Sequence, residues 1–154
     1  MQNDHHFAVS VEWTGNRGTG TSGPREFSRD TVLRAEGKPP VPGSSARVFH
    51  GDASRWNPEE ALIAALVQCH LLSYLYVAVQ NGIVVESYTD EATGTLETDG
   101  SAGRFREVTL RPVVTISAGD PEVARAIHGE ANRLCFIAAS VNFPVRHEPT
   151  IRLA

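Results

Sequence analysis

Two cysteines are the residues of this 154-residue chain whose type and position most favour chemistry. Cys69 lies in the apolar segment NPEEALIAALVQCH and Cys135 in ANRLCFIAASVNFP, so both are predicted to lie on helices. A cysteine thiolate is a nucleophile that an oxidant converts to a sulfenic acid or a disulfide. The alternative is that each cysteine is a small apolar residue packed in the core, which is a common fate of this residue.

A reactive cysteine also needs neighbours that favour its thiolate. An arginine does this, and a carboxylate is needed to orient the arginine. The candidates are Arg17, in the glycine-rich GNRGTG segment, and Glu59, in NPEE. Their alternative roles are a solvated turn residue and a carboxylate that stabilises a helix N-terminus. Ten helical residues span about 15 Å, so Glu59 reaches Cys69 only if the helix is broken or a partner subunit supplies one of the groups.

A metal or cofactor site is not expected. Cys69, His70, His128 and Cys135 are possible ligands, but the chain has no CxxC motif, and adjacent residues such as Cys69 and His70 point about 100° apart on a helix. The GNRGTG segment lacks the Lys-Ser/Thr of a phosphate-binding loop.

The composition predicts one globular domain over residues 1–154. A net charge of −4 argues against nucleic acid as a partner. No run of about 18 residues is apolar without polar interruptions, so no membrane span is expected. The N-terminal MQNDHHFAVS does not resemble a secretory signal, which favours the cytoplasm. Disulfides in that compartment are usually transient.

The N-terminal part of the chain is predicted to be mostly strand and loop. Alternating apolar and polar residues over 6–14 predict a half-buried strand. A glycine-rich turn or bulged hairpin follows, residues 25–33 form the return strand, and residues 35–57 form a long loop.

A helix is predicted from Asn57 to about Gln80. Asn57 can cap it, Pro58 suits the first helical position, and the Asn81-Gly82 pair ends it. This helix is apolar on almost every side, so it must be covered on every side. We therefore expect an obligate homodimer with this helix at its centre.

The remaining elements complete an α+β fold with antiparallel sheet. Strands are expected at 83–98 and 104–117 with a turn at 99–103, a second helix at 120–138, and a last strand at 145–153.

The sequence resembles the OsmC/Ohr family of osmotically inducible and organic hydroperoxide resistance proteins, and its OsmC-like branch in particular. The resemblance rests on W-x-x-x-R-G-x-G at 13–20, on NPEE at 57–60 with Cys69 ten residues after Glu59, and on Cys135 in the late helix. It implies an intertwined homodimer in which antiparallel sheets wrap around central helices.

The resemblance further implies a thiol peroxidase that reduces organic hydroperoxides. Cys69 would be oxidised to a sulfenic acid and Cys135 would resolve it as a disulfide, with no cofactor and with a lipoyl-type dithiol as reductant. Arg17 would favour the thiolate and stabilise charge on the leaving oxygen, and Glu59 would hold Arg17. The alternative is a non-catalytic OsmC-like dimer that binds a small apolar ligand or senses redox state.

Two features depart from the family pattern. The family often has Cys-Pro at the second cysteine, whereas Cys135 is followed by Phe136, which is expected to let the helix continue. The assignment of Arg17 depends on aligning a glycine loop, so Arg25 and Arg29 are the other candidate arginines. The 35–57 loop is expected to cover the pocket.

Overall fold

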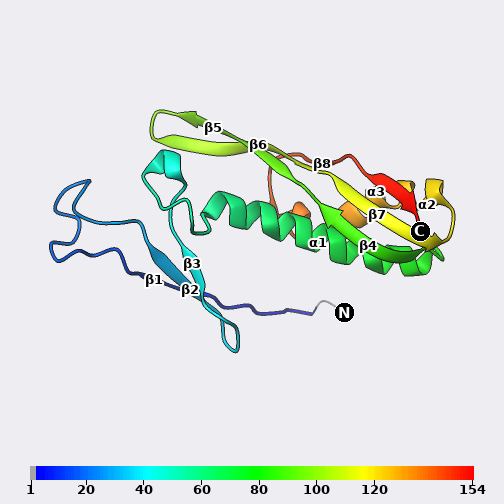
Figure 1. Cartoon of the computed structure of the whole chain (residues 1–154), viewed down its shortest axis with the longest axis horizontal. Coiled ribbons are helices and arrows are strands. Elements are labelled where there is room, and N and C mark those ends of the chain that lie inside the picture. Colours follow the sequence, from blue (N-terminus) through cyan, green and yellow to red (C-terminus); the bar gives the residue numbers. More distant parts are fainter. Residues whose placement is uncertain (1–2) are drawn as a thin grey trace. The chain divides into compact units, whose positions relative to one another are not determined.

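The computed structural model describes residues 3–154, which form two compact units that divide between Ala61 and Leu62 (Figure 1). Residues 1 and 2, part of the segment that argued against a secretory signal, lie outside the described residues. A single domain over residues 1–154 stays a prediction.

The N-terminal unit contains a three-stranded antiparallel sheet in the order β1–β2–β3. The strands are β1 (Ser10–Trp13), β2 (Thr31–Arg34) and β3 (Val41–Gly43). The two predicted strands are present but shorter, and β1 is exposed along its whole length, so the prediction of a half-buried strand was wrong. The segment 35–57 is not wholly loop either, because it contains β3 and the short 3-10 helix η1 (Arg47–Phe49).

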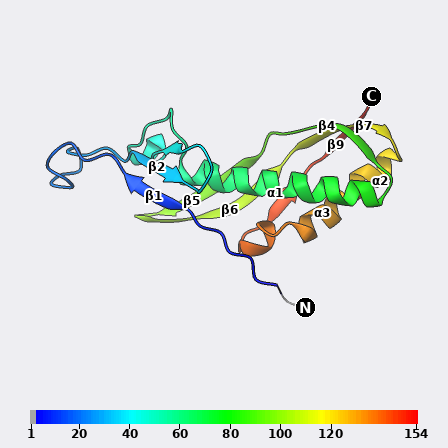
Figure 2. The same ribbon diagram turned by 90° about the horizontal axis from the view of Figure 1, so that it is seen from below.

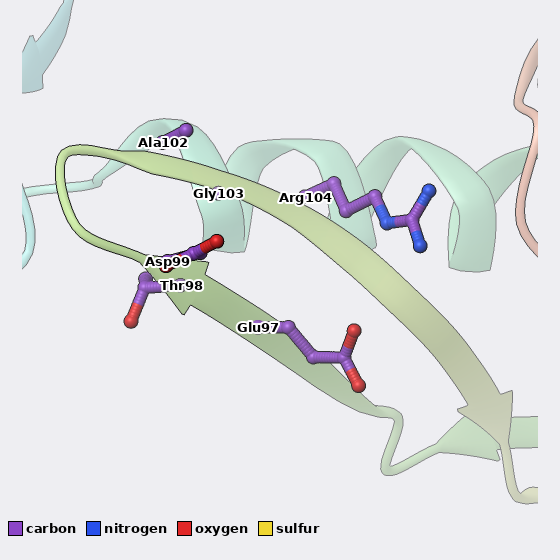
Figure 3. Close-up of a pocket in the computed structure, with 6 residues that line it drawn as sticks. All are labelled: Glu97, Thr98, Asp99, Ala102, Gly103 and Arg104. Atoms are coloured by element: carbon purple, nitrogen blue, oxygen red, sulfur yellow. The ribbon is translucent and has the colours of Figure 1, made fainter.

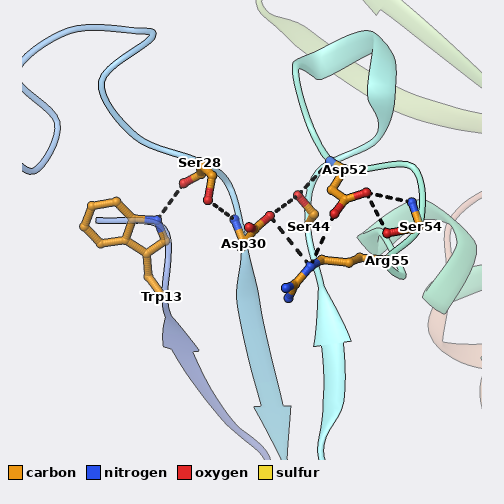
Figure 4. Close-up of polar contacts among 7 residues, drawn as sticks. All are labelled: Trp13, Ser28, Asp30, Ser44, Asp52, Ser54 and Arg55. Carbon is orange, nitrogen blue, oxygen red and sulfur yellow. Dashed lines mark hydrogen bonds and ion pairs between the residues drawn. The ribbon is translucent and has the colours of Figure 1, made fainter. Parts of the chain in front are cut away.

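Polar side chains hold the segment after β3 against the start of β2 (Figure 4). Asp30 accepts a hydrogen bond from the Ser44 hydroxyl at 3.2 Å, and that hydroxyl oxygen accepts one from the Asp52 backbone N–H at 3.1 Å. The Arg55 Nε atom lies 3.5 Å from Asp52 and 3.9 Å from Asp30. Hydrogen bonds from Ser54 lower the pKa of Asp52, which therefore stays ionised beside the arginine.

Helix α1 (Pro58–Gln80) has the predicted boundaries. The Asn57 side chain accepts a hydrogen bond from the Glu60 backbone N–H at 2.8 Å, and Gly82 provides the positive φ of 67° after the last turn. By length and composition, α1 is the one helix within residues 3–154 that is long and apolar enough to cross a membrane. Core helices of other proteins meet the same criterion, so length and composition alone do not identify α1 as a membrane span. The fully buried residues of α1 are Leu66, His70, Tyr74, Val77 and Ala78.

The C-terminal unit contains two three-stranded sheets, in the orders β4–β7–β9 and β5–β6–β8. The pairs β4/β7 and β5/β6 are antiparallel, but β6/β8 and β7/β9 are parallel, so the α+β class was right and the purely antiparallel sheet was wrong. Each of the three predicted strands is divided between the two sheets. The six strands are β4 (Val84–Asp90), β5 (Thr93–Asp99), β6 (Ala102–Leu110), β7 (Pro112–Ala118), β8 (Val145–His147) and β9 (Thr150–Leu153).

Arg111 lies where β6 ends and β7 begins, and it contacts the other two points at which the chain passes between the sheets. Its backbone N–H donates to Asp90 at 2.7 Å, and its guanidinium donates to Thr93 at 2.9 Å and to Glu148 at 3.1 Å. The next residue is Pro112, which has no backbone N–H to continue the strand ladder. These contacts explain why the strands divide here, and a pattern of apolar residues does not contain that information.

The second predicted helix is divided into α2 (Pro121–Ala126) and α3 (His128–Leu134). It begins as predicted, because Asp120 accepts a hydrogen bond from the Glu122 backbone N–H at 2.8 Å. It ends at Leu134 instead of 138, because Cys135 is extended with a ψ of 107°. The expectation that Phe136 lets the helix continue, and the placement of Cys135 within a helix, were therefore wrong.

Helix α1 lies along both sheets of the C-terminal unit (Figures 1 and 2). The part of α1 around Tyr74 and Val77 packs against β7, α2 and α3 in one core cluster. The part around Leu66 packs against β6 and the segment 137–145 in a second cluster. The residues of α1 between these clusters include both Cys69 and His70.

Candidate functional site

The structure brings the two cysteines together. Cys69 is partly exposed on α1, whereas Cys135 is 1% exposed immediately after α3. Both are free thiols, and the Cys69 side chain lies close enough to that of Cys135 to influence its pKa. No feature of the sequence places these two residues in contact, since this depends on how α3 packs against α1.

The two thiols differ in electrostatic environment. Burial, and then the neighbouring Cys69 thiol, raise the pKa of Cys135 to about 11, although the Ala138 backbone N–H lies 3.4 Å from its sulfur. Cys135 therefore keeps its proton at neutral pH. Cys69 is the more accessible sulfur, so an oxidant from solvent meets it first.

One face of α3 positions Cys135. His128, Ala131 and Cys135 follow the i, i+3, i+7 spacing of a single helical face, and each is at most 1% exposed. Ala131 packs in the same core cluster as Tyr74 of α1. A small residue between the two ends of this face lets α3 approach α1 closely.

His128, on this face of α3, forms a buried pair with His70 of α1. His70 Nε2 is 3.0 Å from His128 Nδ1, and the Tyr74 ring stacks on the His128 ring with 4.1 Å between centroids. Burial, and then nearby His147, lower the pKa of His70 to about 4; burial, and then His70, lower that of His128 to about 3. Both rings are therefore neutral at neutral pH, and one donates the shared hydrogen bond.

His70 and His128 had been expected at most to act as metal ligands. Within residues 3–154, no group of three or more His, Cys, Asp or Glu side chains is arranged to hold a metal ion. The sequence signal for the pair was a histidine at an inward position of each of two otherwise apolar helix faces. A histidine at such a position is expected to have a buried polar partner, but the sequence does not show which residue that partner is.

The other predicted site residues occupy different surroundings. Arg17 is exposed in the N-terminal unit, where its guanidinium donates to the Arg25 carbonyl at 3.3 Å. Arg29 donates to the Pro24 carbonyl at 3.1 Å and stacks over Phe27 at 4.5 Å, so it is already occupied locally.

Glu59 is the second residue of α1, and its Oε2 atom is buried without a hydrogen-bond partner among residues 3–154. Because α1 is unbroken from Glu59 to Cys69, a broken helix does not bring the two together. A buried carboxylate oxygen without a partner is unusual, and an arginine would satisfy it.

A hollow of about 640 Å³ lies on the β5–β6 hairpin, away from any thiol (Figure 3). Its walls carry acidic and basic groups from Glu97, Asp99 and Arg104, and none of its lining residues is a cysteine. We therefore place the candidate site at the cysteines and not in this hollow.

Comparison with known proteins identifies the family of the chain. A profile of the OsmC-like protein family matches residues 51–150, which include Glu59 and both cysteines. The chain belongs to the OsmC-like protein family. The recognition made from the NPEE segment and the spacing of Cys69 is thereby confirmed.

This OsmC-like chain is similar over nearly its full length to several relatives. It is 24% identical to the uncharacterized protein YmaD of Bacillus subtilis, over 97% of both chains. A solved OsmC-like protein of unknown function from Vibrio cholerae is 28% identical, with a TM-score of 0.85, covering 95% of this chain and 99% of that one. An organic hydroperoxide resistance protein from Elizabethkingia anophelis has a TM-score of 0.71 at 15% identity, covering all of both chains, and shows a shared fold.

Proposed function

We propose that this OsmC-like protein is a thiol-dependent reductase of organic hydroperoxides. The observation that carries the proposal is the contact between the partly exposed Cys69 and the buried, protonated Cys135. Family membership and a solved relative described as an organic hydroperoxide resistance protein support the same class of substrate.

The proposed cycle begins with the Cys69 thiolate, which attacks one peroxide oxygen. The O–O bond breaks, the alcohol leaves after taking a proton, and Cys69 becomes a sulfenic acid. The Cys135 sulfur then attacks the Cys69 sulfur, and the sulfenic hydroxyl leaves with the Cys135 proton as water. A dithiol, which we propose to be of the lipoyl type, reduces the disulfide and is itself oxidised. No metal or organic cofactor takes part.

The raised pKa of Cys135 suits its part in this cycle. As a protonated, buried thiol it reacts poorly with peroxide, so oxidation begins at Cys69. In the second step Cys135 must lose this proton as its sulfur attacks Cys69, and the leaving hydroxyl takes the proton to form water.

Intact-mass spectrometry after adding one equivalent of cumene hydroperoxide to the reduced protein tests the cycle. We expect a loss of two hydrogens per chain, with the new bond mapped to Cys69–Cys135. An added oxygen on Cys69 alone would keep the peroxidase but remove Cys135 as its resolving cysteine. No reaction of the folded, reduced protein would favour the alternative, a non-catalytic dimer that binds a small apolar ligand or senses redox state.

Arg17 is proposed to favour the Cys69 thiolate, with Glu59 as the carboxylate that holds it. The Arg17→Ala variant is expected to lose about 10- to 100-fold in kcat/KM, because one positive charge beside the sulfur and the leaving oxygen is removed. The matched variants Arg25→Ala and Arg29→Ala should stay within about threefold of the wild type. If one of these two shows the large loss instead, the role moves to that arginine.

We also propose that the working form is a cytoplasmic, intertwined homodimer. The support is a group of exposed apolar residues on α1, which is unusual for a helix with this position in the fold. A dimer would cover them and would let one subunit supply Arg17 or Glu59 to the other. Light scattering should therefore give twice the 16.7 kDa of one chain. The exposed residues are Leu72, Leu75, Tyr76 and Val79.

A further inference from the structure

The histidine pair has no part in the proposed cycle, although a short stretch of chain joins each histidine to one of the cysteines. His70 directly follows Cys69 on α1, and His128 begins α3, which ends immediately before Cys135. His70 and His128 are 1% and 0% exposed. A buried hydrogen bond between two side chains on different helices restricts where those helices can lie.

Helix α3 contacts α1 at both of its ends. At its first residue, His128 meets His70 at 3.0 Å, and just past its last residue, Cys135 meets Cys69. The seven residues of α3 place His128 and Cys135 about 10 Å apart along α3, whereas their partners His70 and Cys69 are consecutive residues of α1. Two contacts this far apart set both the distance and the direction of α3 relative to α1, which one contact does not do.

We propose that His70 and His128 are positioning residues that hold the Cys69 and Cys135 sulfurs in place for disulfide formation. The inference rests on the proposed function for its biological meaning, but its test uses no hydroperoxide. A disulfide requires the two Cα atoms to lie within about 7 Å and the Cβ atoms to face one another. Because the His70–His128 bond holds the first residue of α3 against α1, the helix is less free to move Cys135 away from the position that a disulfide requires.

The test is the equilibrium between the reduced pair and oxidised glutathione, which gives the Cys69–Cys135 disulfide and two reduced glutathione molecules. Asparagine places an amide where Nδ1 of histidine lies, and glutamine places one near Nε2. His70→Gln and His128→Asn therefore keep a polar group at the bonded position, whereas His70→Asn and His128→Gln move it away. All four variants carry a neutral amide of similar size.

We call His70→Asn and His128→Gln the displaced variants, and His70→Gln and His128→Asn the matched variants. We expect the two displaced variants to lower the equilibrium constant for disulfide formation at least tenfold, which is about 30 mV in reduction potential. The two matched variants should stay within about threefold of the wild type. Tyr74→Phe is the control for a purely structural effect, because it removes a buried hydrogen bond of 3.0 Å between α1 and the Ala124 carbonyl of α2. It should destabilise the oxidised and reduced proteins equally and leave the potential unchanged.

Equal potentials in the matched and displaced variants would overturn the inference. So would a shift in Tyr74→Phe as large as that in the displaced variants, or a wild-type protein that forms no disulfide with excess oxidised glutathione. Normal glutathione equilibria in a protein that fails to reduce hydroperoxides would refute the proposed function and leave this inference standing. Should a displaced variant fail to fold, the other displaced variant gives the comparison from the opposite helix.

Discussion

The Cys69→Ser variant is expected to lose hydroperoxide reduction by at least about 1,000-fold, because a serine hydroxyl is a far weaker nucleophile than a thiolate and does not form a stable bond to the transferred oxygen. Turnover is measured as alcohol formed from cumene hydroperoxide with a dithiol reductant in excess. Cys69 lies between the two core clusters of α1 and is partly exposed, so an isosteric hydroxyl should leave the fold intact.

The matched variant is Cys135→Ser, which keeps the nucleophile and removes its partner. It should release one alcohol per chain and then stop, with Cys69 held as a sulfenic or sulfinic acid. The pair of variants separates the two roles, since the first variant should give no burst and the second should give a burst of one. Sustained turnover by the Cys69→Ser protein would refute the proposed mechanism, whatever Cys135 does.

The second large effect concerns stability toward acid. Lowering the pH from about 7 to about 4.5 should reduce the free energy of unfolding by about 3–5 kcal/mol through His70 and His128. Their pKa values in the folded protein are about 4 and about 3, against 6.5 for an unperturbed histidine. As the pH falls through 6.5 the unfolded chain binds protons that the folded protein does not bind. The stability is therefore complete above this range and is lost as the pH falls toward the folded values.

Urea unfolding of the wild type and of the double variant His70→Gln/His128→Asn measures this contribution. Neither amide titrates, so the double variant should lose much less stability over the same pH range. The half-buried His147, whose pKa burial also lowers, remains in both proteins and cancels in the comparison. An identical loss in the two proteins would assign the acid sensitivity to other groups.

Local signals in the sequence account well for the elements that begin and end with specific residues. Helix α1 agrees with its prediction from the Asn57 cap to Gly82, because each terminus is determined by residues adjacent to it. The same holds for the start of α2 at Asp120. The strands were harder to predict, because the change from one sheet to the other depends on Arg111 contacting residues far away in the sequence.

For the candidate site, too, the sequence identified individual residues but not the contacts between them. Cys69 and Cys135 were identified from residue type and from the spacing that resembles a family, and the structure adds that the two side chains are neighbours. The bond between His70 and His128 was not predicted, because it joins residues on two helices whose packing no local pattern specifies. The end of α3 before Cys135 was missed as well, since the prediction relied on the absence of proline and not on the backbone at Cys135 itself.

The contacts of Arg111 have a mechanical consequence for the C-terminal unit. The chain passes from one sheet to the other at three places along one line, and a single residue, Arg111, joins them: its backbone N–H bonds Asp90, and its guanidinium bonds Thr93 and Glu148. The two sheets can therefore tilt relative to each other only about that line. Each sheet also packs on a different stretch of α1, so tilting would require the helix itself to flex. The 23-residue helix α1 thus restricts changes in the angle between the sheets. It thereby also restricts changes in the relative positions of the two sulfur atoms.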